Sequence, residues 1–578
     1  RRQRQMCIRD RHRSLTGTMK GADLGPAPFI FQSFRLKGAL ICKETSERSA
    51  GIRKSVYGCI LRYFVTRCTL ESTVGASAPG KRFRPHLPTY AIFNRRPALR
   101  RSPQGVSIVT LSIKSVAAAT ATLLLPAAAM ASDMNGAELG LAWAVPFAGI
   151  LLSIALFPLF APHIWHHHFG KISVFWALCC IIPLATVFGP DTAFHEIAHV
   201  LLADYVPFII FVGSLFIVAG GIHVRGSFVG RPIVNTAILA LGAVLANFMG
   251  TTGAAMLLIR PLIGAHENRR RKVHTFIFFI FLVANVGGAL TPLGDPPLFL
   301  GFLKGVSFFW TLEHLMLPWL VTCAILLAVY FAIDSFMFSR DVKDGFKAPE
   351  EKQAIGVDGG INILFLAAIV GTVLMSGFWR SGVDFTFLGV HFSLEGVLRD
   401  ALFIVISGAS LLLTTKATRE ANHFSWDPIL EVAKLFFGIF CCIVPVLAML
   451  RAGHDGHFAP LVALVTNADG SFNNTFFFWL TGMLSAFLDN APTYLAFFNL
   501  AGGDPTVLMG EGAKTLMAIS MGSVFMGAVT YIGNAPNFMT VSICNERGIK
   551  MPTFFGYMLW SVTLLFPTFF LMDMLFLI

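Results

Sequence analysis

Gly288-Ala-Leu-Thr-Pro-Leu-Gly-Asp-Pro-Pro-Leu-Phe299 is the stretch that decides the fold, because the chain contains a second version of it. Residues 527–538 read Gly-Ala-Val-Thr-Tyr-Ile-Gly-Asn-Ala-Pro-Asn-Phe, so six of the twelve positions are identical at an offset of 239 residues. The same offset aligns Leu-Ala-Asn-Phe-Met-Gly-Thr-Thr-Gly (245–253) with Leu-Ser-Ala-Phe-Leu-Asp-Asn-Ala-Pro (484–492), and Asp334 with Asp573. A constant offset over about ninety residues predicts two homologous halves.

Both copies place Gly, Pro, Thr and Asn or Asp inside apolar runs, where a helix is expected to break. Lipid does not tolerate broken backbone unless protein or a cavity covers it. Broken helices at matching places in two halves of a membrane protein are the sequence signature of a transporter binding site.

The composition supports a membrane protein, because 55% of the 578 residues are hydrophobic and only 13% are charged. The net charge of +13 is misleading. Residues 1–105 hold 22 Lys and Arg against 5 Asp and Glu, whereas the rest of the chain holds 23 against 27. The basic character therefore belongs to the first segment, and it gives no reason to expect nucleic acid as a partner.

The first 131 residues divide into two parts. Residues 1–105 show no hydrophobic period, and we interpret them as an artefactual or a disordered basic segment. Residues 106–131 have the charged, apolar and Ala-x-Ala order of a cleavable signal peptide, which places the mature N-terminus outside the cytoplasm. A first transmembrane helix is the alternative, although its apolar run is short for one.

The apolar runs predict an all-α polytopic membrane protein with two inverted repeats, 141–338 with its leading span and 361–578. Each repeat contains a re-entrant helical hairpin and a broken transmembrane helix. The predicted spans lie at 141–160, 172–189, 205–222, 317–338, 361–377, 401–413, 433–450 and 553–576. The broken helices lie at 273–303 and 514–545, and the broken segments at 233–262 and 473–501.

The two broken segments are each either one long helix or a hairpin. If both are hairpins, five crossings separate them, so they enter the membrane from opposite faces. The positive-inside rule agrees with this topology, because the loops on one side carry 17 Lys and Arg and those on the other carry 5. The prediction is a protein of the bacterial inner membrane with a periplasmic N-terminus.

The side chains at the breaks are oxygen donors without Lys or Arg, and such donors suit Na⁺. An intramembrane carboxylate marks a functional site, where it can bind a proton or a cation in turn. Two readings compete with this one: Asp295 and, less readily, Asp489 could be helix caps, and the Asn and Thr side chains could satisfy broken backbone. The candidate ligands are Thr251, Thr252, Thr291, Asp295, Asp489, Asn490, Thr493, Thr530, Asn534 and Asn537.

Residues 487–493 together with residues 288–297 resemble the NhaD-type sodium/proton antiporters. Those belong to the ion-transporter superfamily, with arsenite permeases and dicarboxylate and citrate carriers. The resemblance covers residues 137–578 and implies a homodimer whose transport domain moves against a scaffold. It also adds Asn247 to the candidate site. The first hairpin departs from the pattern, because Gly250-Thr-Thr-Gly253 has no carboxylate opposite Asp489.

These observations predict a Na⁺/H⁺ antiporter in which Asp489 alternates between protonated and Na⁺-bound forms, assisted by Asp295. Na⁺, H⁺, the lipid bilayer and a second copy of the chain are the expected partners. No enzymatic activity, cofactor or resident metal is implied. The alternative is a dicarboxylate, citrate or arsenite-type anion carrier that uses half-helix N-termini.

Two histidine motifs need separate interpretations. His195-Glu196-Ile-Ala-His199 matches the zinc-protease pattern, so an intramembrane metalloprotease is a remote alternative. The motif is expected in an external loop, and an inverted repeat has no place in such a protease. His166-His167-His168 is expected in a cytoplasmic turn, either as a pH sensor or simply as a solvated loop.

Overall fold

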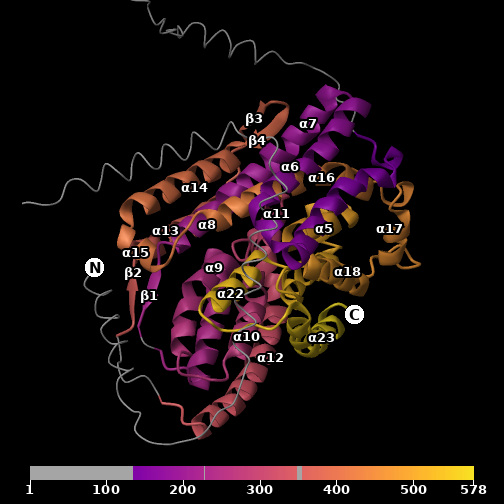
Figure 1. Cartoon of the computed structure of the whole chain (residues 1–578). Helices are drawn as coiled ribbons and strands as arrows, with labels where there is room; N and C mark the ends of the chain where they lie inside the picture. The colour runs from indigo at the N-terminus through magenta and orange to yellow at the C-terminus, as the bar shows by residue number, and fades with distance from the viewer. Residues whose placement is uncertain (1–133, 227, 348–353) are drawn as a thin grey trace, which may run out of the picture. The chain divides into compact units, whose positions relative to one another are not determined.

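The computed structural model describes residues 134–226, 228–347 and 354–578, and the segments 1–105 and 106–131 lie outside these described residues (Figure 1). Helices dominate the described residues, which confirms the predicted all-α class. Their strands form two antiparallel pairs only. The strands are β1 (His223–Arg225) with β2 (Gly356–Asp358), and β3 (Asp384–Phe387) with β4 (Val390–Ser393).

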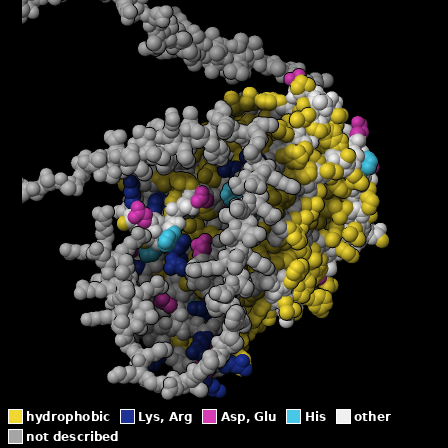
Figure 2. Space-filling model, in the orientation of Figure 1, with side chains coloured by type: hydrophobic (Ala, Val, Ile, Leu, Met, Phe, Trp, Pro, Cys, Tyr) yellow, Lys and Arg dark blue, Asp and Glu magenta, His cyan; other side chains and the backbone are white. Residues whose placement is uncertain are grey.

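Nine helical stretches among the described residues are long and apolar enough to cross a membrane. A broad hydrophobic surface on one side of the molecule is visible in Figure 2, as expected where lipid replaces water. The protein is therefore a multi-pass membrane protein. The nine are Leu141–Phe160, Pro162–Val187, Pro190–Ala219, Pro232–Ala265, Phe308–Lys343, Ile361–Phe378, Leu394–Leu413, Asp427–Arg451 and Phe554–Phe576.

The named helices follow one another along two halves of the chain. The first half contains η1 (Gly136–Glu138), η2 (Leu141–Ala144), α5 (Val145–Phe160), α6 (Pro162–Val187), α7 (Pro190–Val200), the π-helical turn η3 (Leu201–Tyr205), α8 (Val206–Ala219), α9 (Pro232–Ala265), α10 (Val273–Leu282), η4 (Val286–Ala289), α11 (Pro296–Leu303) and α12 (Phe308–Lys343). The second half contains α13 (Ile361–Phe378), α14 (Leu394–Leu413), α15 (Lys416–Ala421), α16 (Asp427–Arg451), η5 (Gly453–Asp455), α17 (Ala459–Val465), α18 (Asn474–Phe487), α19 (Asn490–Leu500), α20 (Pro505–Met509), α21 (Ala513–Phe525), η6 (Met526–Val529), α22 (Ala535–Glu546) and α23 (Phe554–Phe576).

Both broken segments are hairpins. In α9, a Cβ on Gly242 would lie 2.9 Å from Leu258 Cδ1, although 16 residues of straight helix would separate them by about 24 Å. The rings of Phe477 on α18 and Phe497 on α19 are 6.3 Å apart, which also requires the chain to reverse. The structure thus selects the hairpin over the long helix. That the two hairpins enter the bilayer from opposite faces stays a prediction.

The two broken helices share one construction, since a short 3₁₀ turn followed by a segment of bends and turns separates their helical parts. The first consists of α10, η4 and α11, and the second of α21, η6 and α22. In each, the first turn of the second helix contains a proline, Pro296 in α11 and Pro536 in α22, and proline lacks the N–H group that a first-turn residue leaves unbonded. The predicted breaks are therefore present in both halves.

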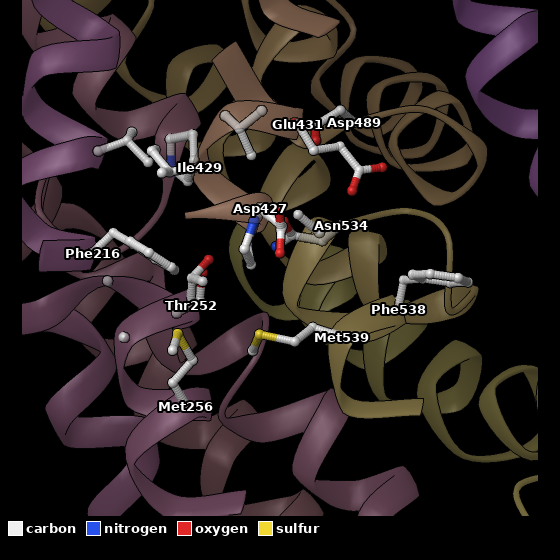
Figure 3. Close-up of a pocket in the computed structure, with 18 of the residues that line it drawn as sticks. Phe216, Thr252, Met256, Asp427, Ile429, Glu431, Asp489, Asn534, Phe538 and Met539 are labelled. Carbon is white, nitrogen blue, oxygen red and sulfur yellow. The ribbon is translucent and has the colours of Figure 1, made fainter. Parts of the chain in front are cut away.

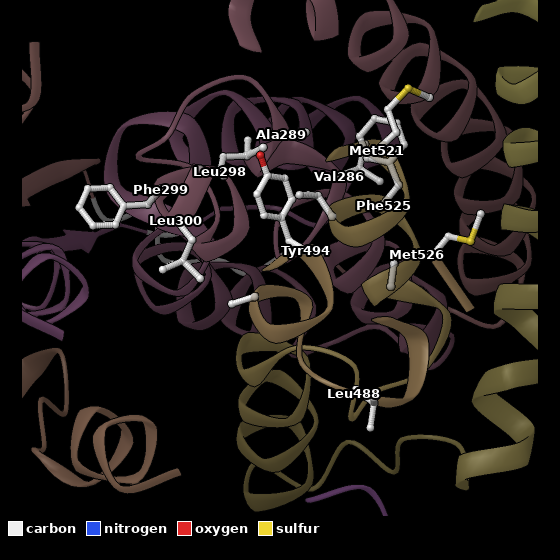
Figure 4. Close-up of a cluster of buried hydrophobic side chains, with 14 of the residues drawn as sticks. Val286, Ala289, Leu298, Phe299, Leu300, Leu488, Tyr494, Met521, Phe525 and Met526 are labelled. Atoms are coloured by element: carbon white, nitrogen blue, oxygen red, sulfur yellow. The ribbon is translucent and has the colours of Figure 1, made fainter. Parts of the chain in front are cut away.

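A continuous apolar core surrounds these breaks (Figure 4). The side chains of α10 are buried on all sides, which is the pattern of a helix enclosed by other helices. Residues from both halves share the cluster, such as Val286 and Leu298 with Tyr494 and Phe525. The ring of Phe211 on α8 stacks on Phe299 of α11 at 3.6 Å between centroids.

A buried cluster of charged side chains lies where the end of α9, the start of α10 and the end of α12 meet. Arg269, which is fully buried, pairs with Asp334 at 2.6 Å and with Asp341 at 3.1 Å. His274 Nε2 lies 2.8 Å from Asp334 Oδ1. Outside the spans, the Arg271 guanidinium lowers the pKa of Asp344 by hydrogen bonding to its carboxylate. These ion pairs fix the loop between α9 and α10 onto α12.

Candidate functional site

The first hairpin reverses at Gly250, whose φ of +74° lies in the region that glycine alone enters without strain. A Cβ at this position would have room, since its nearest neighbour would be Leu215 Cδ1 at 3.6 Å. The backbone conformation therefore requires the glycine. Beyond the turn, Thr251 N donates to Gly294 O at 2.9 Å and joins the hairpin to the broken helix.

Asn247 and Thr291 hold these two elements together. Thr291 Oγ1 donates to Asn247 O at 2.6 Å, and Asn247 Oδ1 accepts from Leu290 N at 2.9 Å. Both side chains are buried and bonded to backbone that the breaks leave unpaired. Their geometry is that of structural residues in this conformation.

The second half repeats this arrangement at the offset of 239 residues. Thr530 Oγ1 donates to Ala486 O, as Thr291 does to Asn247 O. Leu293 N donates to Thr291 Oγ1 at 3.2 Å, and Ile532 N donates to Thr530 Oγ1 at 3.3 Å. The repeat seen in the sequence is thus also a repeat of hydrogen bonds.

Asp295 is the point where both halves meet. It is 1% exposed, and its Oδ1 accepts from Thr251 Oγ1 at 2.9 Å. From the second half, Asn490 Nδ2 donates to Oδ2 at 2.8 Å and Asn534 Nδ2 donates to Oδ1 at 3.3 Å. None of the ion pairs between described residues includes Asp295, so neutral donors alone surround its carboxylate.

The helix-cap interpretation of Asp295 is wrong. Asp295 occupies the N-cap position of α11, but its side chain makes no capping hydrogen bond. Its carboxylate turns instead toward donors from the hairpins and the other half, as its bonds to Thr251 and Asn490 show.

Asp489, in contrast, is a cap. It lies between α18 and α19, and its Oδ1 accepts from Ala491 N at 3.2 Å. Asp489 is partly exposed, whereas Asp295 is buried. The sequence favoured Asp489 as the proton carrier and Asp295 as the possible cap. In the structure Asp295 is the buried carboxylate without a capping bond, and Asp489 is the cap.

A cavity of about 480 Å³ adjoins the breaks. Figure 3 shows Thr252 and Met256 of α9 opposite Asn534, the N-cap residue of α22, and Met539 of α22. Asp427, Glu431 and Asp489 also line the wall. The cavity brings together five of the predicted site residues: Thr251, Thr252, Asp295, Asp489 and Asn534. The other six are bonded within the protein around it: Asn247, Thr291, Asn490, Thr493, Thr530 and Asn537.

The sequence reasoning missed the charged residues that other helices contribute to this cavity. Asp427 and Glu431 come from α16, Glu546 from α22, Arg260 from α9 and His166 from α6. Glu431 lies two residues before the predicted span 433–450, so the rule that an acidic residue within a span marks a functional site did not reach it. Five carboxylates line the cavity, and Arg260 is the sole Lys or Arg among its described lining residues.

The two histidine motifs lie in helices. His195, Glu196 and His199 are on α7, which continues through η3 into α8, so the predicted external loop is wrong. His195 Nε2 contacts Gly389 O at 3.3 Å. Among the described residues, no group of three or more His, Cys, Asp or Glu is arranged to hold a metal ion. His166, His167 and His168 belong to α6 and not to a turn.

Two helical hairpins and two broken helices that meet at a buried carboxylate beside a cavity define the class of membrane transporters. The chain belongs to the family described as "Putative citrate transport", whose model matches residues 136–577. This family lies in the ion-transporter superfamily.

Two relatives are also transporters or membrane proteins by name. An uncharacterized transporter of Mycobacterium tuberculosis is 24% identical over 325 residues, which cover 55% of this chain and 71% of the relative. A 46 kDa membrane protein of Mycobacterium leprae is 23% identical over 324 residues, covering 54% of this chain and 68% of the relative. The protein is therefore a multi-pass member of a transporter family.

Proposed function

We propose that the protein is a secondary active transporter that exchanges Na⁺ for H⁺ at Asp295. The observation that supports this most is the environment of its carboxylate, which is buried, bonded to three neutral donors and not paired with a cationic side chain. An uncompensated charge within a membrane is costly, so a proton or a cation is expected to neutralise it in turn.

Asp489 and the neighbouring oxygens would complete the cation site. One oxygen of Asp489 caps α19, which leaves Oδ2 available to a cation in the cavity. Thr252 and Asn534 line the same cavity with side-chain oxygens. In this proposal Asp295 carries the exchanged proton, and Asp489, to which the sequence assigned that role, supplies a ligand.

A carboxylate anion of the citrate class is the second candidate substrate. The family match supports it, and α11 and α22 both direct their N-termini toward the cavity, where Pro296 and Ala535 line the wall. Helix N-termini attract anions. However, five carboxylates against one arginine would repel a free trianion, so such a substrate would enter together with protons or a cation.

Transport by the full chain in proteoliposomes tests both candidates. We expect Na⁺ to dissipate a preset proton gradient in the wild type and not in Asp295→Asn. Labelled citrate is offered in parallel, with and without Mg²⁺. Citrate uptake that requires Asp295, without any Na⁺-dependent proton flux, would replace Na⁺/H⁺ exchange by the second candidate.

The remaining expectations are part of this proposal: a homodimer, a moving transport domain, a bacterial inner-membrane location and a periplasmic N-terminus. The charge difference of 17 against 5 basic residues between the two sets of loops predicted from the sequence supports the orientation. Labelling of single cysteines with an impermeant reagent tests it. A cysteine at position 270 should react only after the membrane is opened.

A further inference from the structure

Asn285 is a fully buried polar residue at the point where the first broken helix opens, and the proposed exchange does not yet use it. It is the N-cap residue of η4, with φ of −140° and ψ of −87°, and it therefore lies between α10 and that 3₁₀ turn. Its Nδ2 donates to Ile280 O at 2.8 Å, which satisfies a carbonyl near the end of α10.

The other bonds of Asn285 reach the second half of the chain. Its Nδ2 also donates to Asn537 Oδ1 at 2.7 Å, and its Oδ1 accepts from Asn534 Nδ2 at 3.3 Å. Asn537 Nδ2 in turn donates to Gly527 O at 2.9 Å and to Thr530 O at 3.0 Å. Asn285 therefore links the break of the first helix to the break of the second.

The amide of Asn534 is the shared element of this network. Its Nδ2 lies 3.1 Å from Ala284 O, 3.3 Å from Asn285 Oδ1 and 3.3 Å from Asp295 Oδ1. Two N–H groups thus serve three acceptors, and the position of Asn285 fixes how the amide is oriented toward Asp295. No direct bond joins Asn285 to Asp295 among the hydrogen bonds of the described residues.

Only the first half of the chain carries a residue that forms this link. The position equivalent to Asn285 at the offset of 239 residues is Val524, which cannot form it. Asn285 is also outside the repeated motif, which begins at Gly288. Asn285 is thus present in one half only, where it contacts two asparagines of the other.

We propose that Asn285 is a positioning residue that sets the affinity of the cation site by orienting Asn534 toward Asp295. The inference rests on the proposed function, in which Asp295 binds the exchanged ion. Asn285 itself does not touch the ion. Removing its side chain would free the Asn534 amide to turn toward Ala284 O, and the carboxylate would lose a donor that both halves hold in place.

The test uses purified full-length protein and Na⁺ as the probe, with Na⁺-induced proton release followed across pH. We expect Asn285→Ala to raise the half-saturating Na⁺ concentration about tenfold, the effect of losing one hydrogen bond to a charged group. It should also move the pH of half-maximal release. Asn285→Ser is the milder variant, and it carries the test if the alanine variant does not fold.

Asn362 provides a matched control. It is also fully buried and bonded to backbone and hydroxyl groups, with Nδ2 2.8 Å from Thr414 Oγ1 and Oδ1 2.6 Å from Ser410 Oγ. Asn362→Ala should lower thermal stability to a similar degree and leave the Na⁺ affinity and the pH profile unchanged. An equal shift in both variants would show that Asn285 acts through general stability, and would overturn the inference.

A double-mutant cycle isolates the path through Asn534. If Asn285 acts through that amide, Asn285→Ala should have little further effect in an Asn534→Ala background, so the two changes are not additive. Additive effects would overturn the inference. If Asn285→Ala keeps the Na⁺ affinity of the wild type, the inference about Asn285 is overturned and the proposed function still stands. If the wild type releases no protons when Na⁺ is added, the proposed function is refuted and the inference falls with it.

Discussion

Replacing Asp295 by Asn is the sharpest test of the site, because the change removes the charge and almost nothing else. The new Oδ1 can still accept from Thr251 and Asn534. The new Nδ2 would face Asn490 Nδ2, which now lies 2.8 Å from Asp295 Oδ2. Turning the Asn490 amide over resolves this conflict. Its Nδ2 would then take the place of Oδ1, 2.7 Å from Ser485 Oγ, and this hydroxyl can accept from it while donating its own proton to Ser523 O at 2.6 Å.

The energies that change nearly cancel. Each of the three hydrogen bonds to Asp295 contributes about 1.5–3 kcal/mol when the carboxylate is charged and about 0.5–1.5 kcal/mol when the group is neutral. A charge at the centre of a membrane span costs roughly 2.5–3.5 kcal/mol on insertion scales. We therefore expect the unfolding free energy of Asp295→Asn to lie within about 2 kcal/mol of the wild type. Exchange, in contrast, should fall to background, because an amide cannot trade a proton for Na⁺.

Asp573→Asn is the matched control for this variant. Asp573 is also buried among neutral donors, with Thr475 Oγ1 at 2.9 Å and Trp479 Nε1 at 3.0 Å, and it does not line the cavity. The assay is thermal unfolding of the purified proteins together with Na⁺-dependent proton flux in proteoliposomes. Undiminished flux in Asp295→Asn, or equal loss in the control, would refute the assignment.

Three further predictions follow from the same geometry. Asp489→Asn should fold normally, because Asn caps a helix about as well as Asp, but should raise the Na⁺ concentration needed for half-maximal exchange; an unchanged Na⁺ dependence would exclude Asp489 as a ligand. Gly250→Ala should cost about 1–3 kcal/mol in unfolding measurements, because its φ is +74°; Gly371→Ala in α13, where a Cβ meets nothing within 4 Å, should instead be neutral or stabilising. Lys304→Met leaves Asp204, which is 4% exposed, without the ammonium group at 2.7 Å, and it should lower the free energy of unfolding by about 2–4 kcal/mol. Adding Asp204→Asn should restore part of this loss, and equal stability of the single and double variants would contradict the prediction.

Much of the fold could be predicted from the sequence because its signals are local. Apolar runs define spans, and Gly, Pro and Asn inside them define breaks, as at Gly250 and Asp295. Whether a broken segment is a hairpin was open, since the answer depends on a contact such as that between Gly242 and Leu258, 16 residues apart. The helical state of His166 was missed because α6 begins at Pro162 and packs on α16, where Ser173 Oγ donates to Lys434 O.

The roles within the site were harder to predict than its membership. Asp295 and Asp489 both stand at N-cap positions, so spacing alone could not separate the cap from the uncapped carboxylate. What separates them is the set of donors that the fold brings together. Thr251, Asn490 and Asn534 reach Asp295 from 44, 195 and 239 residues away. The cavity wall on α16 was missed for the same reason, since only packing brings Glu431 there.

The bond between Asn534 and Asp295 has a consequence for how two similar halves can share one centre. These residues are each other's counterparts in the repeat, and they lie 3.3 Å apart. If both were aspartates, two carboxylates at that distance could not both be ionised, and the pair would retain a proton or separate. If both were asparagines, no charge would remain to be exchanged. One acid beside one amide gives a contact that is stable when the acid is ionised, so the departure from symmetry at this one pair makes the shared centre chemically useful.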